Sequence, residues 1–174
     1  MIEWTKTMRR ATAASLLLVF AASVPLAAVD GDKAAYFGGT YAAYAGAKEP
    51  IEGQLNTRLE DALILTPLER EYAGQQLRIP YNKVVDLEYG QKAGRRVGAA
   101  VATSVLLGPI GLVSLFSKKR KHYLTIGYTD DAGKDQVAVL ELGKDMVRTT
   151  LAIVETRSGK KIAYQDDEAR KSSR

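Results

Sequence analysis

Residues 122–142 read HYLTIGYTDDAGKDQVAVLEL, and this stretch decides the fold. Its first part sets Leu124, Ile126 and Tyr128 on one face and smaller or more polar residues on the other, as a half-buried strand does. The segment DDAGKD then supplies a turn, and an apolar strand pattern resumes in QVAVLEL. The stretch therefore predicts a β-hairpin, the clearest in the chain.

Further strand signals lie upstream of this hairpin. The segment KVVDLEYG, residues 83–90, alternates side chains in the same way, with Val85, Leu87 and Tyr89 on one face and Val84, Asp86 and Glu88 on the other. Before it, IEGQLNTRLEDALILTP predicts two strands joined at RLED, and LRIPY predicts a third that follows a turn at Gly74 and ends near Pro80. Antiparallel hairpins in series are typical of a sandwich or an open barrel.

The last regular element is predicted to be a helix. Val147, Leu151 and Val154 recur at helical spacing, Asp145 stands where a capping carboxylate is expected, and Gly159 stands where a helix ends. The remaining residues, 158–174, predict a polar tail. N-terminal to the strands, residues 29–50 predict a lead-in segment, in which YFGGTYAAYAGA is either a strand with a bend or a loosely ordered stretch.

Six or seven strands and one C-terminal helix predict a mainly β (α+β) fold. Within it, GQLNTRLEDALILTP followed by LRIPYNKVVDLEY resembles the pattern of GRAM and pleckstrin-homology-like (PH-like) domains over residues 51–157. The resemblance implies an antiparallel PH-like barrel or sandwich with a C-terminal helix and an apolar helical insert. More closely, the chain resembles a group of uncharacterised exported bacterial proteins that share YFGGT, YGQKAGRRVG, KKRKHYLTIGY and ELGKD. That likeness implies export and no particular activity.

The first 28 residues predict an export signal. Lys6, Arg9 and Arg10 precede an apolar run over residues 11–24, and LAA ends at Ala28. We expect an exported protein, periplasmic or associated with an envelope membrane; an uncleaved N-terminal anchor is the alternative. The other 146 of 174 residues are enough for one folded domain. A net charge of +5 is too small to predict a nucleic-acid partner.

An uncharged insert interrupts the strand pattern at residues 97–116. Gly108 and Pro109 break it into two arms, because proline removes a backbone donor and clashes with the preceding turn. Spanning a bilayer once would place the flanking strands on opposite sides, so we favour a hairpin that dips into a membrane or packs on a membrane protein. Packing on its own barrel or on a second copy, as a homo-oligomer, stays open, and so does spanning. The predicted contacts with an anionic surface are the flanking cations Arg95, Arg96, Lys118, Lys119, Arg120 and Lys121.

The residues that enzymes and metal sites need are scarce. The chain has no cysteine, and its one histidine, His122, stands beside basic residues that disfavour its protonated form. Asp130, Asp131 and Asp135 lie in a hairpin turn without calcium-loop spacing, so we interpret them as turn residues. Lys48 stands beside Glu49 and Glu52 near the first hairpin loop and gives no support for phosphoinositide recognition. We expect no enzyme activity, cofactor or metal.

These features predict an exported, non-enzymatic PH-like module that binds or scaffolds at an envelope membrane surface. Its expected partner is the lipid surface or a membrane protein. The alternative is an integral membrane protein in which residues 97–116 span the bilayer.

Overall fold

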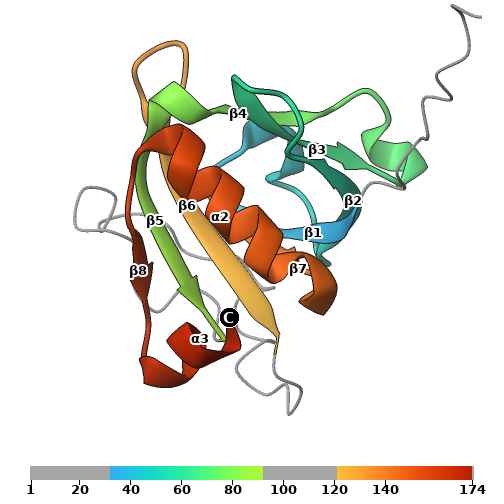
Figure 1. Ribbon diagram of the computed structural model, residues 1–174. Helices are drawn as coiled ribbons and strands as arrows, with labels where there is room; N and C mark the ends of the chain where they lie inside the picture. The colour runs from blue at the N-terminus through green and yellow to red at the C-terminus, as the bar shows by residue number, and fades with distance from the viewer. Residues whose placement is uncertain (1–31, 92–120, 174) are drawn as a thin grey trace, which may run out of the picture. The chain divides into compact units, whose positions relative to one another are not determined.

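A computed structural model of the chain describes residues 32–91 and 121–173. The predicted export signal, residues 1–28, and the insert, residues 97–116, lie outside these ranges. The described part is mainly β, with eight strands in one curled sheet (Figure 1). The strands are β1 (Asp32–Gly39), β2 (Ile51–Asn56), β3 (Ala62–Pro67), β4 (Leu77–Pro80), β5 (Val84–Gly90), β6 (His122–Thr129), β7 (Asp135–Leu142) and β8 (Ile162–Tyr164). The helices are η1 (Ala42–Tyr44), η2 (Arg70–Tyr72), η3 (Tyr81–Lys83), η4 (Lys144–Met146), α2 (Val147–Ser158) and α3 (Asp167–Ser172).

The sheet follows the order β4-β3-β2-β1-β7-β6-β5-β8, and all pairs but the last are antiparallel. The hairpin predicted over residues 122–142 is confirmed as β6 and β7, which pair from His122 with Leu142 to Thr129 with Asp135. β5 pairs directly with β6. The strands on either side of the insert therefore belong to one sheet.

The main core fills the concave face of the sheet. Leu87 of β5, Ile126 of β6 and Leu140 of β7 meet the buried side chains of α2 there, namely Val147, Thr150, Leu151 and Val154. Figure 1 shows α2 lying across the sheet at β6. Burial of this apolar stripe is what holds a helix of this length in place, since a short helix is marginal alone.

The ends of the predicted helix are partly confirmed. Gly159 takes a left-handed conformation, with φ of 68°, and its N–H bonds to the Glu155 carbonyl. The cap predicted at Asp145 is wrong, because this residue lies inside the 3-10 turn η4 and no side chain caps α2. The turn continues into the helix, so the carboxylate has no free helix end to cap.

The sheet is larger than the sequence pattern indicated. β1 lies between β2 and β7, so the expected boundary at residue 51 falls inside the sheet and the lead-in contains a central strand. The expected polar tail adds β8, which pairs with β5, and α3, which buries Ala169. Both segments contain few large aliphatic side chains, so the spacing of their apolar residues gave only a weak signal for strands or helices. No helix in the described ranges is long and apolar enough to cross a membrane.

Candidate functional site

The insert leaves the sheet at a base formed by β5 and β6. Gly90 at the end of β5 pairs with Tyr123 near the start of β6, so the described strands that flank segment 92–120 lie side by side. The Tyr89 hydroxyl lies 2.6 Å from Nδ1 of His122 and 3.4 Å from the Ser172 hydroxyl of α3. The insert base is thus tied together by a buried tyrosine that contacts β6 and α3.

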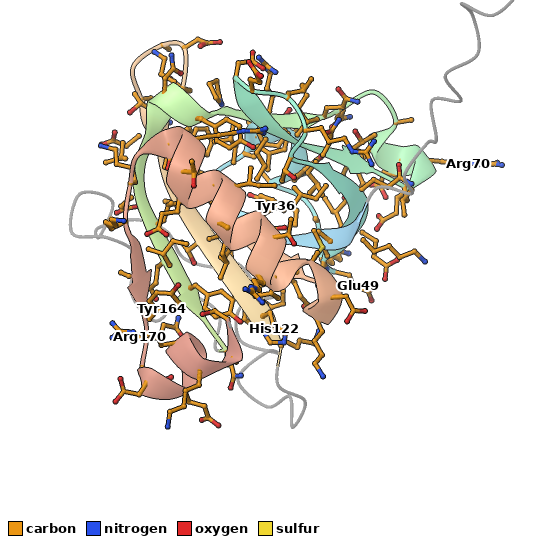
Figure 2. The ribbon with its side chains drawn as sticks, in the orientation of Figure 1. Tyr36, Glu49, Arg70, His122, Tyr164 and Arg170 are labelled. Atoms are coloured by element: carbon orange, nitrogen blue, oxygen red, sulfur yellow. The ribbon has the colours of Figure 1, made fainter. Side chains whose placement is uncertain are left out.

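Aromatic and basic side chains gather around this base. Figure 2 shows His122, Tyr164 and Arg170 toward the end of the sheet where β5 ends and β6 begins. The Tyr164 ring meets that of Tyr89 edge to face, with centroids 6.0 Å apart, and the Arg170 guanidinium lies 5.5 Å from the Tyr164 centroid. Such contacts stabilise a surface without defining a catalytic group.

His122 is the first residue of β6, as its position in the sequence predicted. Burial lowers its pKa, and the charge of Lys144 lowers it further. The direction matches the expectation from the sequence, but the main cause is burial rather than repulsion by neighbouring cations. A neutral imidazole at this position accepts the hydrogen bond of Tyr89 through Nδ1 when its proton lies on Nε2.

This environment predicts a pH-dependent stability. A histidine whose pKa is lowered on folding binds fewer protons folded than unfolded, so stability is complete above about pH 6.5 and falls as the pH drops below it. We expect a lower urea midpoint at pH 5.5 than at pH 7.5 in the native chain. In His122→Asn, whose amide oxygen can accept the same bond, this difference should shrink markedly. His122 is the chain's only histidine, so an unchanged difference would contradict its role.

One predicted surface cation lies in the described ranges. Lys121 Nζ is 2.9 Å from Glu141 Oε2 on β7, and both side chains are about one-third exposed or less, at 35% and 24%. Part of its charge is therefore engaged within the protein. The other predicted contacts, Arg95, Arg96, Lys118, Lys119 and Arg120, and the predicted break at Gly108 and Pro109, lie outside the described residues.

Of the three aspartates interpreted as turn residues, Asp130 bonds within the β6–β7 turn, whereas Asp135 is the first residue of β7. Asp130 Oδ1 accepts bonds from the N–H groups of Ala132 and Lys134, at 2.9 and 2.8 Å, and Oδ2 accepts from Gln136 Nε2. These bonds, led by the Lys134 N–H, lower the pKa of Asp130. Across residues 32–91 and 121–173, no three His, Cys, Asp or Glu side chains come together as metal ligands.

A groove of about 900 Å³ lies at the opposite end of β5 and β6. Tyr41, Tyr81 and Tyr128 contribute rings to its lining, and burial raises the pKa of Tyr128 to about 12. Its lining carries charges of both signs, and Arg78 and Asp61 form an ion pair within it. The remaining lining residues include Thr40, Glu60, Lys83, Asp131, Lys134 and Gln136.

Arg157 closes one side of this groove. Its guanidinium donates to the carbonyls of Thr57 and Leu59 and lies 5.6 Å from the Tyr81 ring centroid. The last turn of α2 is thereby joined to the loop between β2 and β3. The Tyr81 hydroxyl is buried beside this guanidinium, and burial raises the pKa of Tyr81 while Arg157 opposes the rise.

Sequence reasoning did not identify this groove. Its residues come from five separate segments, and only the curl of the sheet brings them together. The signal available was the density of tyrosines, nine in the chain. No protein-family model and no curated protein matches the chain.

Proposed function

We propose that this chain is an exported, non-enzymatic PH-like module that binds or scaffolds at an envelope membrane surface. The insert and its basic flanks make the membrane contact. The partner is the lipid surface or a membrane protein.

The observation that carries the proposal is the pairing of β5 with β6. Gly90 lies opposite Tyr123, so the chain leaves and returns at one end of one sheet. A segment tied in this way enters and leaves a membrane from the same side, as a monotopic anchor does. The cations on both sides of residues 97–116 favour the same arrangement, because each of them can lie at headgroup level.

The topology supports the PH-like part of the proposal. Seven strands run in the order β4-β3-β2-β1-β7-β6-β5, and α2 follows the seventh strand and packs on the concave face. This is the arrangement expected of a barrel closed by a C-terminal helix. β8 and α3 are additions to that plan.

The groove supports a scaffolding role. It lies at the far end of β5 from the insert base, about 20 Å away for a strand of this length. A module held at a membrane through the insert would present the groove away from that surface. Its tyrosine rings and mixed charges are typical of a surface that binds another protein.

Vesicle flotation tests the membrane contact. Changing Arg95, Arg96, Lys118, Lys119 and Arg120 to glutamine should reduce binding to anionic vesicles at least tenfold, since each basic residue near such a surface contributes about 1 kcal/mol. Lys121 is kept because it pairs with Glu141. High salt should weaken binding of the native chain in the same direction.

The matched control removes five exposed cations from elsewhere on the described surface. It should bind anionic vesicles nearly as the native chain does, and equal losses in both variants would contradict a contact at the insert. Carbonate extraction of native membranes addresses the alternative, because an integral protein stays in the pellet and a peripheral module is released. The control positions are Lys48, Arg70, Lys134, Arg148 and Lys160.

A further inference from the structure

The sheet is buried on both faces over half of its width. In β2 the burial alternates strictly, and Glu52, Gln54 and Asn56 are exposed on the convex face. In β6 every residue from Tyr123 to Tyr128 is buried, and in β7 every residue from Val137 to Leu140. A strand at the surface of a sandwich or barrel alternates, whereas a strand covered on both sides does not.

The second buried face is the convex face of β1, β7, β6 and β5. Phe37 and Tyr123 are 3% exposed, Val137 and Val139 are 0% exposed, and Thr125 is 5% exposed. The hydrophobic members of this set do not belong to the main core cluster on the concave face. The rings of Phe37 and Tyr123 meet edge to face across β7, with centroids 4.9 Å apart. We call this set of five residues the outer patch.

The described helices do not account for the burial of the outer patch. α2 and α3 direct their buried side chains, such as Leu151 and Ala169, into the main core. Gln165, which follows the edge strand β8, reaches β5, where its amide donates to Glu88. Burial also raises the pKa of Tyr123. Neither described α-helix therefore covers the outer patch with its buried side chains.

The insert is connected to this face at both ends. Gly90 and Tyr123, which bracket segment 92–120, face the convex side because their neighbours Tyr89 and Leu124 face the core. Lys121 lies two residues before Tyr123 and so points to the same side, where it pairs with Glu141 of β7. Lys121, the first described residue after the insert, therefore has its side chain on the face that carries the outer patch.

We propose that the uncharged insert, residues 97–116, packs on the outer patch. Four strands spaced about 4.8 Å apart make a face about 14 Å wide, and the eleven residues before Gly108 would cover about 16 Å as a helix. The cations that flank the insert also match the carboxylates on this face, Glu88 and Glu141. One side of the insert then contacts the sheet, and its other side is left for the membrane surface.

Cysteine labelling in solution tests this inference, because the chain contains no cysteine. Val139→Cys should react with a maleimide at least roughly tenfold more slowly than Gln54→Cys on exposed β2, both in the full chain and in a chain that lacks residues 1–28. Replacing residues 97–116 with a Gly-Ser linker should abolish this difference. Ala138→Cys, on the concave face, should stay protected in the linker variant and so report that the barrel is folded.

Other results would overturn the proposal. One is fast labelling of Val139→Cys in the full chain, and another is protection that survives the linker but is lost with residues 1–28, which would assign the outer patch to the N-terminal segment. Fast labelling of Ala138→Cys in the linker variant would mean that this variant is not folded. The packing of the insert is then tested in the intact chain instead. There, Val139→Cys should form an intramolecular disulfide with a cysteine at Ala100, Ser104 or Leu112, whereas Gln54→Cys should not; no disulfide at any of the three would refute the packing. No vesicles are present, so the outcome is independent of the flotation result.

Discussion

Gly39→Ala is expected to destabilise the domain by about 3 kcal/mol or more. Gly39 has φ of 138°, a conformation that is almost exclusive to glycine and costs other residues about 1–3 kcal/mol. A Cβ there would lie 2.1 Å from the Val137 carbonyl oxygen, which is backbone and cannot rotate away. That oxygen accepts the Thr40 N–H at 2.9 Å, so relieving the clash would also separate the end of β1 from β7.

Gly46→Ala is the matched control for this change. Apart from its two chain neighbours, no described residue has a heavy atom within 4 Å of the position that its Cβ would take, and its φ is not positive. We expect a neutral effect or a gain of about 0.4–1 kcal/mol from reduced freedom of the unfolded chain. Urea unfolding of both variants measures the two effects. A loss of under about 1 kcal/mol for Gly39→Ala would show that β1 does not lie on β7 in this way.

Much of the sheet was predictable because its strands alternate or carry clear turns. The β6–β7 hairpin, the strand at Leu87 and Tyr89, and the helix ending at Gly159 each follow from local patterns. β1 was ambiguous because Gly38 and Gly39 replace the side chains that would mark a strand. The conformational freedom of these glycines lets β1 approach β7 closely, and a local sequence pattern does not reveal such a tertiary contact.

The site was less predictable, for a physical reason. The groove and the insert base depend on side chains that meet only after the sheet curls, such as Arg157 with Tyr81 and Tyr89 with His122. Lys121 is another tertiary contact that the sequence could not predict. In the sequence all the cations of residues 118–121 look equally exposed, but in the structure Lys121 pairs with Glu141. The sequence did indicate the location of the insert, since an uncharged run between cations is evident without a fold.

Val139→Asp is expected to destabilise the domain by about 3–5 kcal/mol. Val139 is fully buried on the convex face, so the change places an unpaired carboxylate where water is excluded. Burial would raise the pKa of the introduced carboxyl, and protonation would then relieve part of the cost. The loss should therefore be smaller at pH 5 than at pH 8, measured against the native chain at each pH by urea unfolding.

Val85→Asp provides the matched comparison, because Val85 is 39% exposed on β5, a strand of the same sheet that β6 separates from β7. Its carboxylate keeps its hydration, so we expect a change within about 0.5 kcal/mol and little dependence on pH. Equal effects at the two positions would mean that the convex face of β7 is open to water. A large loss at Val139 alone would instead establish that this face is a second interior, whichever segment covers it. The same two substitutions, made in the linker variant, then show which segment covers Val139. If residues 97–116 cover it, the loss of stability caused by Val139→Asp falls when they are removed; if another segment covers it, the loss stays the same.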